Sequence, residues 1–233
     1  MEFDRPLISG TLERRYKRFL ADVTLEDGRS VTAHCANTGA MLGVQMPGSE
    51  VWLEPNDNPK RKLNYSWKLI RADGAMVGID TSVPNRVVGE ALNQRAVSEF
   101  ADYPIVRPEL PYGKNSRVDF HLSGGEQPDV FLEVKNVHLC RKPGLAEFPD
   151  CVTTRGTKHL RDLADVAAKG HRAVMFYFVH RGDCDVLKMA EDLDPDYAKG
   201  LSDAVAAGVE VLAYKTHVRI TDITLAEPIP VMV

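Results

Sequence analysis

Two acidic residues and a lysine near the middle of the chain have the types and the spacing of a metal-dependent phosphodiester site. Asp119 comes first, and Glu133 and Lys135 follow it, two residues apart from each other. A magnesium ion prefers oxygen ligands and is usually held by one or two carboxylates together with water and substrate phosphate. A neighbouring lysine can orient or deprotonate a water molecule on the ion, or stabilise negative charge that grows on the phosphate. The spacing therefore predicts a Mg²⁺ or Mn²⁺ site at Asp119 and Glu133, with Lys135 beside it.

The segments that carry these residues have the pattern of an antiparallel hairpin. Strands are predicted over residues 117–122 and 129–137, on either side of a Ser-Gly-Gly turn signal. Because side chains alternate between the two faces of a strand, Glu133 and Lys135 share one face, roughly 6.6 Å apart along the chain. If the polar faces of the two strands align, Asp119 joins them. The alternative is that Glu133 and Lys135 are solvated charges on an edge strand.

Motifs along the whole chain point to one bacterial family. They read, in chain order, LERRYKRFLADV, AHCANTGAMLG, NPKRKLNYSWKL, VPNRVVGEAL, YGKNSRVDF, FLEVKNV and FPDCVTTRGTKHL. Their order and spacing resemble the sugar fermentation stimulation protein A (SfsA) family. The resemblance implies an N-terminal OB-fold joined to a PD-(D/E)xK nuclease-like domain, in DNA-binding proteins described as regulators of maltose and related sugar metabolism. Val118 precedes Asp119 where the nuclease motif usually has a proline, which is a departure from the pattern.

The helix predicted before the hairpin adds a third candidate ligand through this resemblance. Ser82 can cap a helix over residues 84–100, with proline tolerated in its first turn. In nuclease-like folds a glutamate on the first helix often completes the metal site. The resemblance therefore implies that Glu90 joins Asp119 and Glu133 as a metal ligand. The alternative is an exposed helix glutamate.

A second helix is predicted over residues 155–169, capped by Thr153 or Thr154 at its start. Arg155 and His159 are four residues apart and lie on one side of this helix. In nuclease-like domains the helix after the Glu-x-Lys strand packs over that strand. The resemblance therefore makes Arg155 a candidate for binding the scissile phosphate and His159 a candidate proton shuttle. The alternative for His159 is a structural, half-buried histidine.

The first 82 residues have the pattern of an all-β domain. Short strands are predicted over residues 7–12, 19–25, 30–36, 50–54, 63–71 and 76–80, separated by turn signals. This density of short strands fits a small barrel such as an OB-fold. The predicted fold class is α/β (α+β): an OB-like barrel over residues 1–82, then a restriction-endonuclease-like, mixed-sheet domain of the PD-(D/E)xK type over residues 83–233. Residues 138–154 are predicted to be an irregular loop over the site.

Basic residues interleaved with aromatic rings predict contact with nucleic acid. Positive charges follow the phosphates, and rings stack on unpaired bases. The predicted contact residues are Arg14, Arg15, Lys17, Arg18, Lys60, Arg61, Lys62, Tyr65, Trp67, Arg117, Arg155 and Lys158. The alternative for the aromatic residues is a place in the barrel core.

Composition limits the class of protein. With 233 residues and a net charge of −4, the chain is not a generally basic nucleic-acid coat, so local patches must bind any phosphate. No apolar run reaches the roughly 18 residues that span a membrane, and the first residues lack the order of a signal peptide, so we expect a cytoplasmic protein without a membrane partner. The four cysteines form no C-x-x-C pair, which favours reduced thiols over a zinc ribbon.

These patterns together predict a DNA-binding protein that is a divalent-metal-dependent nuclease acting on phosphodiester bonds. The expected partner is DNA, single- or double-stranded and bound without sequence preference. The alternative is a non-catalytic DNA-binding transcriptional regulator of sugar (maltose) metabolism. The two differ in their need for metal, because cleavage requires the ion and regulatory binding does not.

Overall fold

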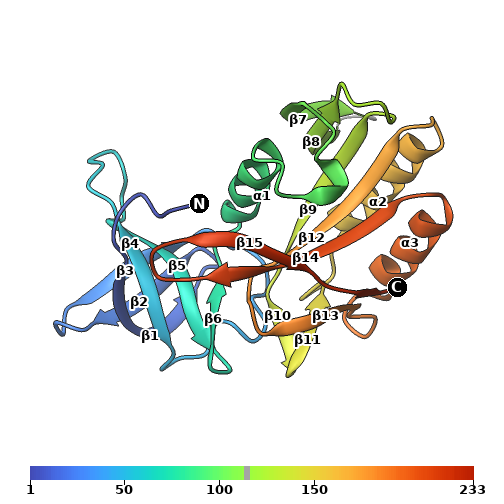
Figure 1. Ribbon diagram of the computed structural model, residues 1–233. Helices are drawn as coiled ribbons and strands as arrows, with labels where there is room; N and C mark the ends of the chain where they lie inside the picture. Colours follow the sequence, from blue (N-terminus) through green and yellow to red (C-terminus); the bar gives the residue numbers. More distant parts are fainter. Residues whose placement is uncertain (113–115) are drawn as a thin grey trace.

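The computed structural model describes residues 1–112 and 116–233, which form a barrel beside a larger α/β domain (Figure 1). The barrel contains strands β1 to β6, and the larger domain contains α1, α2, α3 and the later strands. The predicted fold class is therefore confirmed.

The barrel is built from short strands close to those predicted. They are β1 (Ile8–Tyr16), β2 (Leu20–Leu25), β3 (Ser30–Cys35), β4 (Glu50–Pro55), β5 (Tyr65–Ala72) and β6 (Ala75–Gly78). They pair in the order β3-β2-β1-β4-β5-β6, and β3 also pairs with β5, which closes the barrel. Alternate side chains such as Leu12, Val23 and Leu53 point inward and are fully buried. β1 is longer than predicted, so Arg14 and Arg15 lie on a strand.

The larger domain is organised around one mixed sheet. Its strands are β7 (Ile105–Tyr112), β8 (Ser116–Ser123), β9 (Val130–Val137), β12 (Arg172–Val179), β14 (Glu210–Val218) and β15 (Ile223–Pro228). Their order is β15-β14-β12-β9-β8-β7, with β12 parallel to both β9 and β14. The predicted hairpin is present as β8 and β9, and Phe120 lies opposite Leu132 in it.

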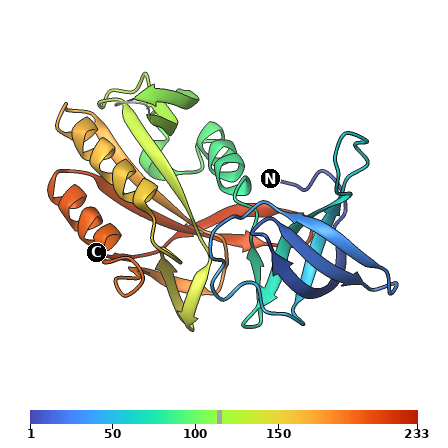
Figure 2. The same cartoon turned by 180° about the vertical axis from the view of Figure 1, so that it is seen from behind.

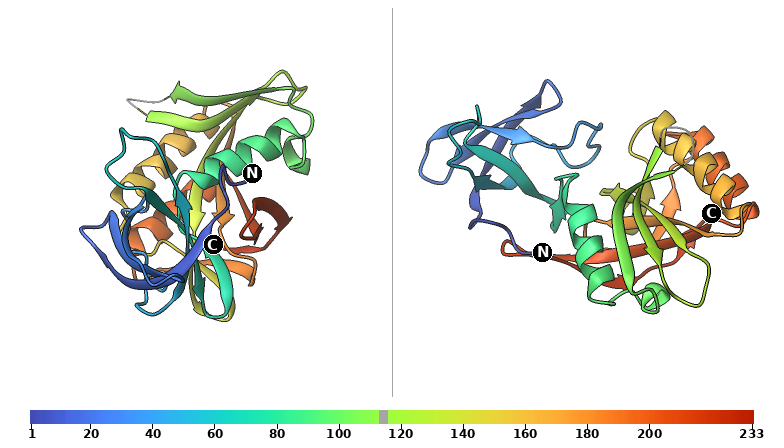
Figure 3. Two further views of the ribbon diagram at one scale, coloured as in Figure 1. Left: turned by 90° about the vertical axis from the view of Figure 1, so that its left-hand side faces the viewer. Right: turned by 90° about the horizontal axis from the view of Figure 1, so that it is seen from above.

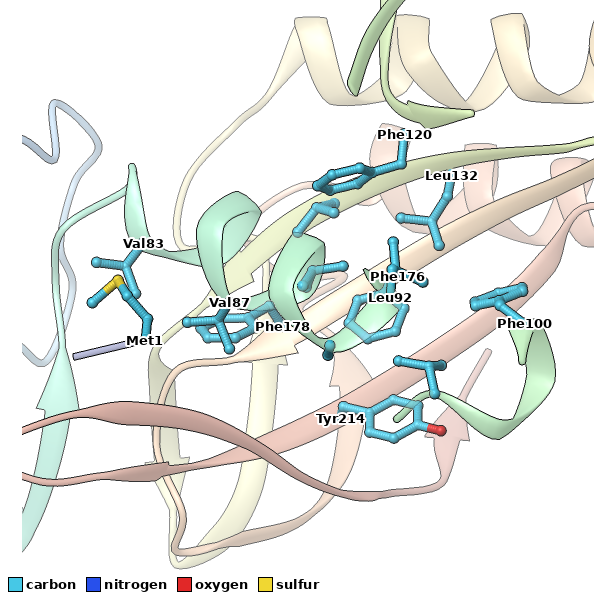
Figure 4. Close-up of a cluster of buried hydrophobic side chains, with 14 of the residues drawn as sticks. Met1, Val83, Val87, Leu92, Phe100, Phe120, Leu132, Phe176, Phe178 and Tyr214 are labelled. Atoms are coloured by element: carbon cyan, nitrogen blue, oxygen red, sulfur yellow. The ribbon is translucent and has the colours of Figure 1, made fainter. Parts of the chain in front are cut away.

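Helices cover both faces of this sheet (Figures 1 and 2). α1 (Val83–Asn93) packs on one face, where Val87 and Leu92 contact a core that contains Leu132 and Phe176 (Figure 4). α2 (Thr154–Ala167) and α3 (Pro195–Ala206) pack on the other face. Because β9 alternates between these faces, its even-numbered apolar residues face α1. Glu133 and Lys135 consequently face α2.

The first helix is shorter than predicted. α1 ends at Asn93 rather than near residue 100, because Arg95 adopts a left-handed conformation with φ 56°. A separate short 3₁₀ helix, η1 (Ser98–Phe100), follows. Ser82 does not cap α1 with its side chain; its hydroxyl donates a hydrogen bond to Asp80 Oδ1 at 2.7 Å.

The predicted irregular segment 138–154 instead contains a hairpin. β10 (Leu139–Lys142) and β11 (Gly144–Phe148) join β13 (Cys184–Met189) and β16 (Val231–Met232) in a second, four-stranded sheet. The two prolines that suggested a loop lie outside the strands, since Pro143 falls in the turn and Pro149 follows β11. The segment is therefore part of the scaffold. All four cysteines are free thiols.

The barrel and the larger domain are joined by direct contacts and lie side by side (Figure 3). Gly78 N donates to His180 O at 2.9 Å, and Met41 N donates to Asp150 Oδ2 at 2.7 Å. Phe3 N donates to Thr221 O at 3.2 Å, so the first residues pack on the larger domain. In the described part of the chain, no helix has the length and apolar character needed to cross a membrane.

Candidate active site

Glu133 and Lys135 of β9 meet His159 of α2 on the sheet face that α2 covers. Glu133 is 3% exposed, and its Oε1 accepts hydrogen bonds from Lys135 Nζ at 2.7 Å and from His159 Nδ1. Burial by itself would raise the pKa of Glu133, but the hydrogen bond from His159 and the charge of Lys135 hold this pKa below its ordinary value. Glu133 is therefore an ionised carboxylate held between a lysine and a histidine.

The neighbours of His159 determine its tautomer. Arg155 Nε donates to His159 Nε2 at 3.3 Å, while His159 Nδ1 donates to Glu133. These partners assign a neutral imidazole with its proton on Nδ1. The sequence correctly predicts that Arg155 and His159 share one side of α2. Arg155 is exposed, so its guanidinium connects the buried histidine to the surface.

The side chain of Asp119 on β8 bonds to the backbone of the neighbouring strand β9 and to a side chain of α1. Its Oδ2 accepts a hydrogen bond from Val134 N at 2.7 Å, and its Oδ1 accepts one from Asn85 Nδ2 at 2.8 Å. Burial, followed by repulsion from the carboxylate of Glu133, raises the pKa of Asp119. Asp119 and Glu133 thus converge closely enough to repel each other, as the aligned hairpin requires.

Glu90 does not join these carboxylates, and this part of the prediction is wrong. Its side chain is 46% exposed, and its Oε2 lies 2.8 Å from the amino group of Met1. The α1 residue that reaches Asp119 is Asn85, five positions earlier and so about 140° away around the helix. No feature of the sequence marks Asn85 as a site residue, because its role depends on the way α1 packs against the hairpin.

The remaining carboxylate pair fits a divalent cation. Among residues 1–112 and 116–233, no group of three or more His, Cys, Asp or Glu side chains could hold a metal ion. Mg²⁺ and Mn²⁺ need fewer protein ligands than that, because water and phosphate complete their coordination. Glu133 Oε2 is buried and has no hydrogen-bond partner in the described residues. A cation at this oxygen would also offset the repulsion that raises the pKa of Asp119.

Two predicted phosphate contacts of the larger domain lie at the surface. Arg117 and Lys158 are exposed, and Lys158 Nζ donates to Asp162 Oδ2 at 2.8 Å, one turn along α2. Lys158 lies between Arg155 and His159 in sequence and on the exposed side of the helix. Phosphate binding by Arg117 and Lys158 stays a prediction.

The barrel removes two residues from the predicted nucleic-acid contacts. Trp67 is completely buried in the barrel core and donates from Nε1 to Leu69 O at 2.8 Å, so its ring cannot stack on a base. Arg15 donates from Nη2 to the carbonyl oxygens of Arg18, Asn37 and Gly39, at 2.8–3.0 Å. This guanidinium ties loops of the barrel together, which is a structural role.

The other predicted barrel contacts stay accessible. Arg14 Cζ lies 4.8 Å from the centroid of the Tyr16 ring, and the guanidinium forms a salt bridge with Asp22. Tyr65 is half-buried against the barrel core, whereas the other residues of this group are exposed. This exposed group comprises Arg14, Lys17, Arg18, Lys60, Arg61 and Lys62. Their contact with nucleic acid stays a prediction.

Comparison with known proteins gives the relationship of the whole chain. Residues 14–79 match the family model described as the SfsA N-terminal OB domain, and residues 82–222 match the sugar fermentation stimulation protein RE domain. The chain belongs to the SfsA family. The resemblance seen in the sequence motifs is thereby confirmed.

The SfsA relatives are similar over nearly their full length. A sugar fermentation stimulation protein homolog of Ruegeria pomeroyi is 54% identical over 228 residues, which cover 97% of this chain and 99% of that protein. A homolog of Dinoroseobacter shibae is 55% identical over 233 residues, covering 99% and 96%. A solved structure described as Pyrococcus furiosus SfsA in complex with Ca²⁺ has a TM-score of 0.90 and 26% identity, and the match covers 100% of this chain and 98% of that one.

Proposed function

We propose that the protein binds DNA and is a divalent-metal-dependent nuclease that hydrolyses phosphodiester bonds. The observation that supports this most directly is the asymmetry of Glu133. Its Oε1 is held by Lys135 and His159, while its buried Oε2, without a partner in the described chain, is left for a ligand near Asp119. The SfsA relative solved in complex with Ca²⁺ supports a divalent cation as that ligand.

The residues of this site have separable roles. Asp119 and Glu133 would hold Mg²⁺ or Mn²⁺, which when bound stabilises the negative charge on the reacting phosphate. Lys135, fixed by its hydrogen bond to Glu133, would stabilise the charge that develops on the phosphate oxygens. His159 carries its lone pair on Nε2, so this is the atom that can take up a proton. Arg155 approaches from the surface and would bind the scissile phosphate.

The barrel would hold the rest of the DNA. Its exposed cations, Arg14 and Lys17 on one side and residues 60–62 on another, can follow phosphates without reading bases. This mode of binding gives little sequence preference. The proposal places the protein in the cytoplasm with its substrate.

Cleavage of two DNA substrates tests the proposal. We expect the wild-type protein to nick supercoiled plasmid or cut a labelled single strand with Mn²⁺ or Mg²⁺ and not in EDTA. Lys135→Ala should lower the rate by at least about 100-fold, because it removes the cation that faces the reacting phosphate. Lys199→Ala is the matched control, since Lys199 is exposed on α3 and pairs with Asp203.

The opposite result would favour the alternative function. If neither substrate is cut with either metal, while wild type and Lys135→Ala bind DNA in EDTA with the same salt dependence, the nuclease proposal is wrong. The protein would then fit a non-catalytic DNA-binding regulator of sugar (maltose) metabolism.

A further inference from the structure

Tyr112, at the end of β7, carries a buried hydroxyl group that the chain does not satisfy. The residue is 8% exposed, and among the described residues its Oη has no hydrogen-bond partner. Its ring packs in the core beneath α2, with its centroid 6.1 Å from that of Phe131. A buried hydroxyl without a partner destabilises the fold, and a hydrogen bond to a water molecule or ligand would remove this cost.

The other buried tyrosines show that this is not a general feature of the fold. Tyr103 donates to Pro128 O at 2.8 Å, and Tyr214 donates to Glu99 Oε2 at 2.7 Å. The hydroxyl groups of Tyr177 and Tyr197 bond to each other at 2.7 Å. Each of these phenols has a partner in the chain, which leaves Tyr112 as the exception among the buried tyrosines of the described residues.

The surroundings of Tyr112 connect it to the candidate active site. Burial raises the pKa of this phenol, and the negative charges of Glu133, Asp162 and Asp119 raise it further. Glu133 Oε2 is the other buried oxygen on this face of the sheet that lacks a hydrogen-bond partner within the described chain. On the sheet face that α2 covers, the Tyr112 hydroxyl is thus an unpaired donor and Glu133 Oε2 an unpaired acceptor.

We propose that Tyr112 is a positioning residue of this site, whose hydroxyl donates a hydrogen bond to a water molecule in the hydration shell of the cation that Asp119 and Glu133 Oε2 would hold. This water would use one lone pair to accept from Tyr112 and the other to bind the divalent cation, which leaves its hydrogens for phosphate oxygens. Tyr112 would thereby orient the hydration shell of the ion. This inference rests on the proposed metal dependence of the site.

The variant Tyr112→Phe removes the hydroxyl and keeps the ring. We expect its dissociation constant for Mn²⁺, measured from the paramagnetic resonance signal of free Mn²⁺, to rise at least about tenfold. We expect kcat for cleavage to fall while KM for DNA is unchanged. Thermal stability in EDTA should stay the same or rise, because the lost hydroxyl has no partner in the chain.

Tyr103→Phe is the matched control. It removes a buried hydroxyl in the core on the α1 face of the sheet and leaves Pro128 O without its donor, so it should lower stability and leave Mn²⁺ binding unchanged. If Tyr112→Phe behaves like this control, Tyr112 is structural and the inference is overturned.

The experiment separates the failure of the two proposals. Wild-type cleavage with equal Mn²⁺ binding and equal kcat in Tyr112→Phe would overturn the inference and leave the nuclease standing. Absent cleavage, together with weaker Mn²⁺ binding by Tyr112→Phe, would support the inference and overturn the nuclease. A wild-type protein that binds no Mn²⁺ would overturn both.

Discussion

Asp80 at the junction of the two domains and Asp119 at the candidate site are both shielded from solvent, yet their surroundings shift the pKa of the two carboxyl groups in opposite directions. Asp80 accepts hydrogen bonds from Lys68 Nζ at 2.6 Å and from Ser82 N and Oγ at 2.9 and 2.7 Å. Burial pushes the pKa of Asp80 up, but Lys68 and Ser82 outweigh it and leave this pKa below its ordinary value. Asp119 receives two neutral hydrogen bonds and faces Glu133, and its pKa is raised.

The two aspartates differ in whether a nearby lysine pairs with them. Lys68 pairs with Asp80 and also lies 3.3 Å from Glu54, so the junction balances its buried charges. Lys135 donates to Glu133 at 2.7 Å, and Asp119 lacks an equivalent partner among the described residues. The paired charges at the junction therefore stabilise the fold. At the site, the negative charge of Asp119 and Glu133 is not balanced within the described chain, so a bound cation can balance it.

The largest expected effects come from making the same substitution in both regions. Asp119→Asn should lower metal-dependent cleavage by at least about 100-fold, because it removes a ligand charge. Its stability should be unchanged or higher, since Asn85 can turn its amide to match the new side chain. Asp80→Asn should cost about 3 kcal/mol of unfolding free energy, because Lys68 loses its closest buried partner.

Urea unfolding and plasmid nicking measure these two effects. The comparison fails if Asp119→Asn is as unstable as Asp80→Asn, or if it cleaves like the wild type. Either result would mean that Asp119 is a structural carboxylate.

The junction should be equally intolerant of added volume. A Cβ at position 78 would lie 1.8 Å from His180 Nε2, so Gly78→Ala should cost about 3 kcal/mol. His180→Ala in the same chain should restore part of this loss, because the two side chains clash with each other. Thermal unfolding of both single variants and the double variant measures the coupling, and purely additive losses would contradict it.

The pH dependence of stability should have opposite signs in the two regions. The lowered pKa of Asp80 contributes stability that is present above its ordinary value of 3.8 and is lost as pH falls through the folded-state pKa. The advantage of wild type over Asp80→Asn should therefore shrink in acid. The raised pKa of Asp119 favours the fold below 3.8, and this contribution is lost as pH rises through the folded-state pKa.

Relative to wild type, Asp119→Asn should accordingly become more favourable as pH rises above about 4. Urea unfolding at a series of pH values measures both differences. If the unfolding free energies of wild type and both variants change in parallel with pH, neither the pKa of Asp80 nor that of Asp119 shifts on folding in the expected direction.

The smallest expected effects distinguish two neighbouring arginines of the barrel. Arg14→Ala should change stability by less than about 0.5 kcal/mol and reduce the salt slope of DNA binding by about 1, because an exposed phosphate contact is lost. Arg15→Ala should cost about 2 kcal/mol, because three carbonyl groups lose a charged donor. Equal salt slopes for both variants would remove Arg14 from the DNA surface.

Local pattern was enough to predict the elements that carry the site. The alternation in β9 placed Glu133 and Lys135 on one face, and the four-residue spacing in α2 placed Arg155 beside His159. Such periodicities are properties of a strand or helix by itself, so they can be read without knowing its neighbours. The short barrel strands followed from turn residues for the same reason.

Only the tertiary structure decided which side chains meet across elements. The packing angle of α1 brings Asn85 to Asp119 and turns Glu90 away, closure of the barrel buries Trp67, and the loops around Arg15 take up its donors. The hydroxyl of Tyr112 likewise becomes buried and unpaired only when Tyr112 packs into the core beneath α2. A sequence pattern determines the face on which a residue lies, whereas long-range packing determines what that face meets, and the chemistry of this site depends on both.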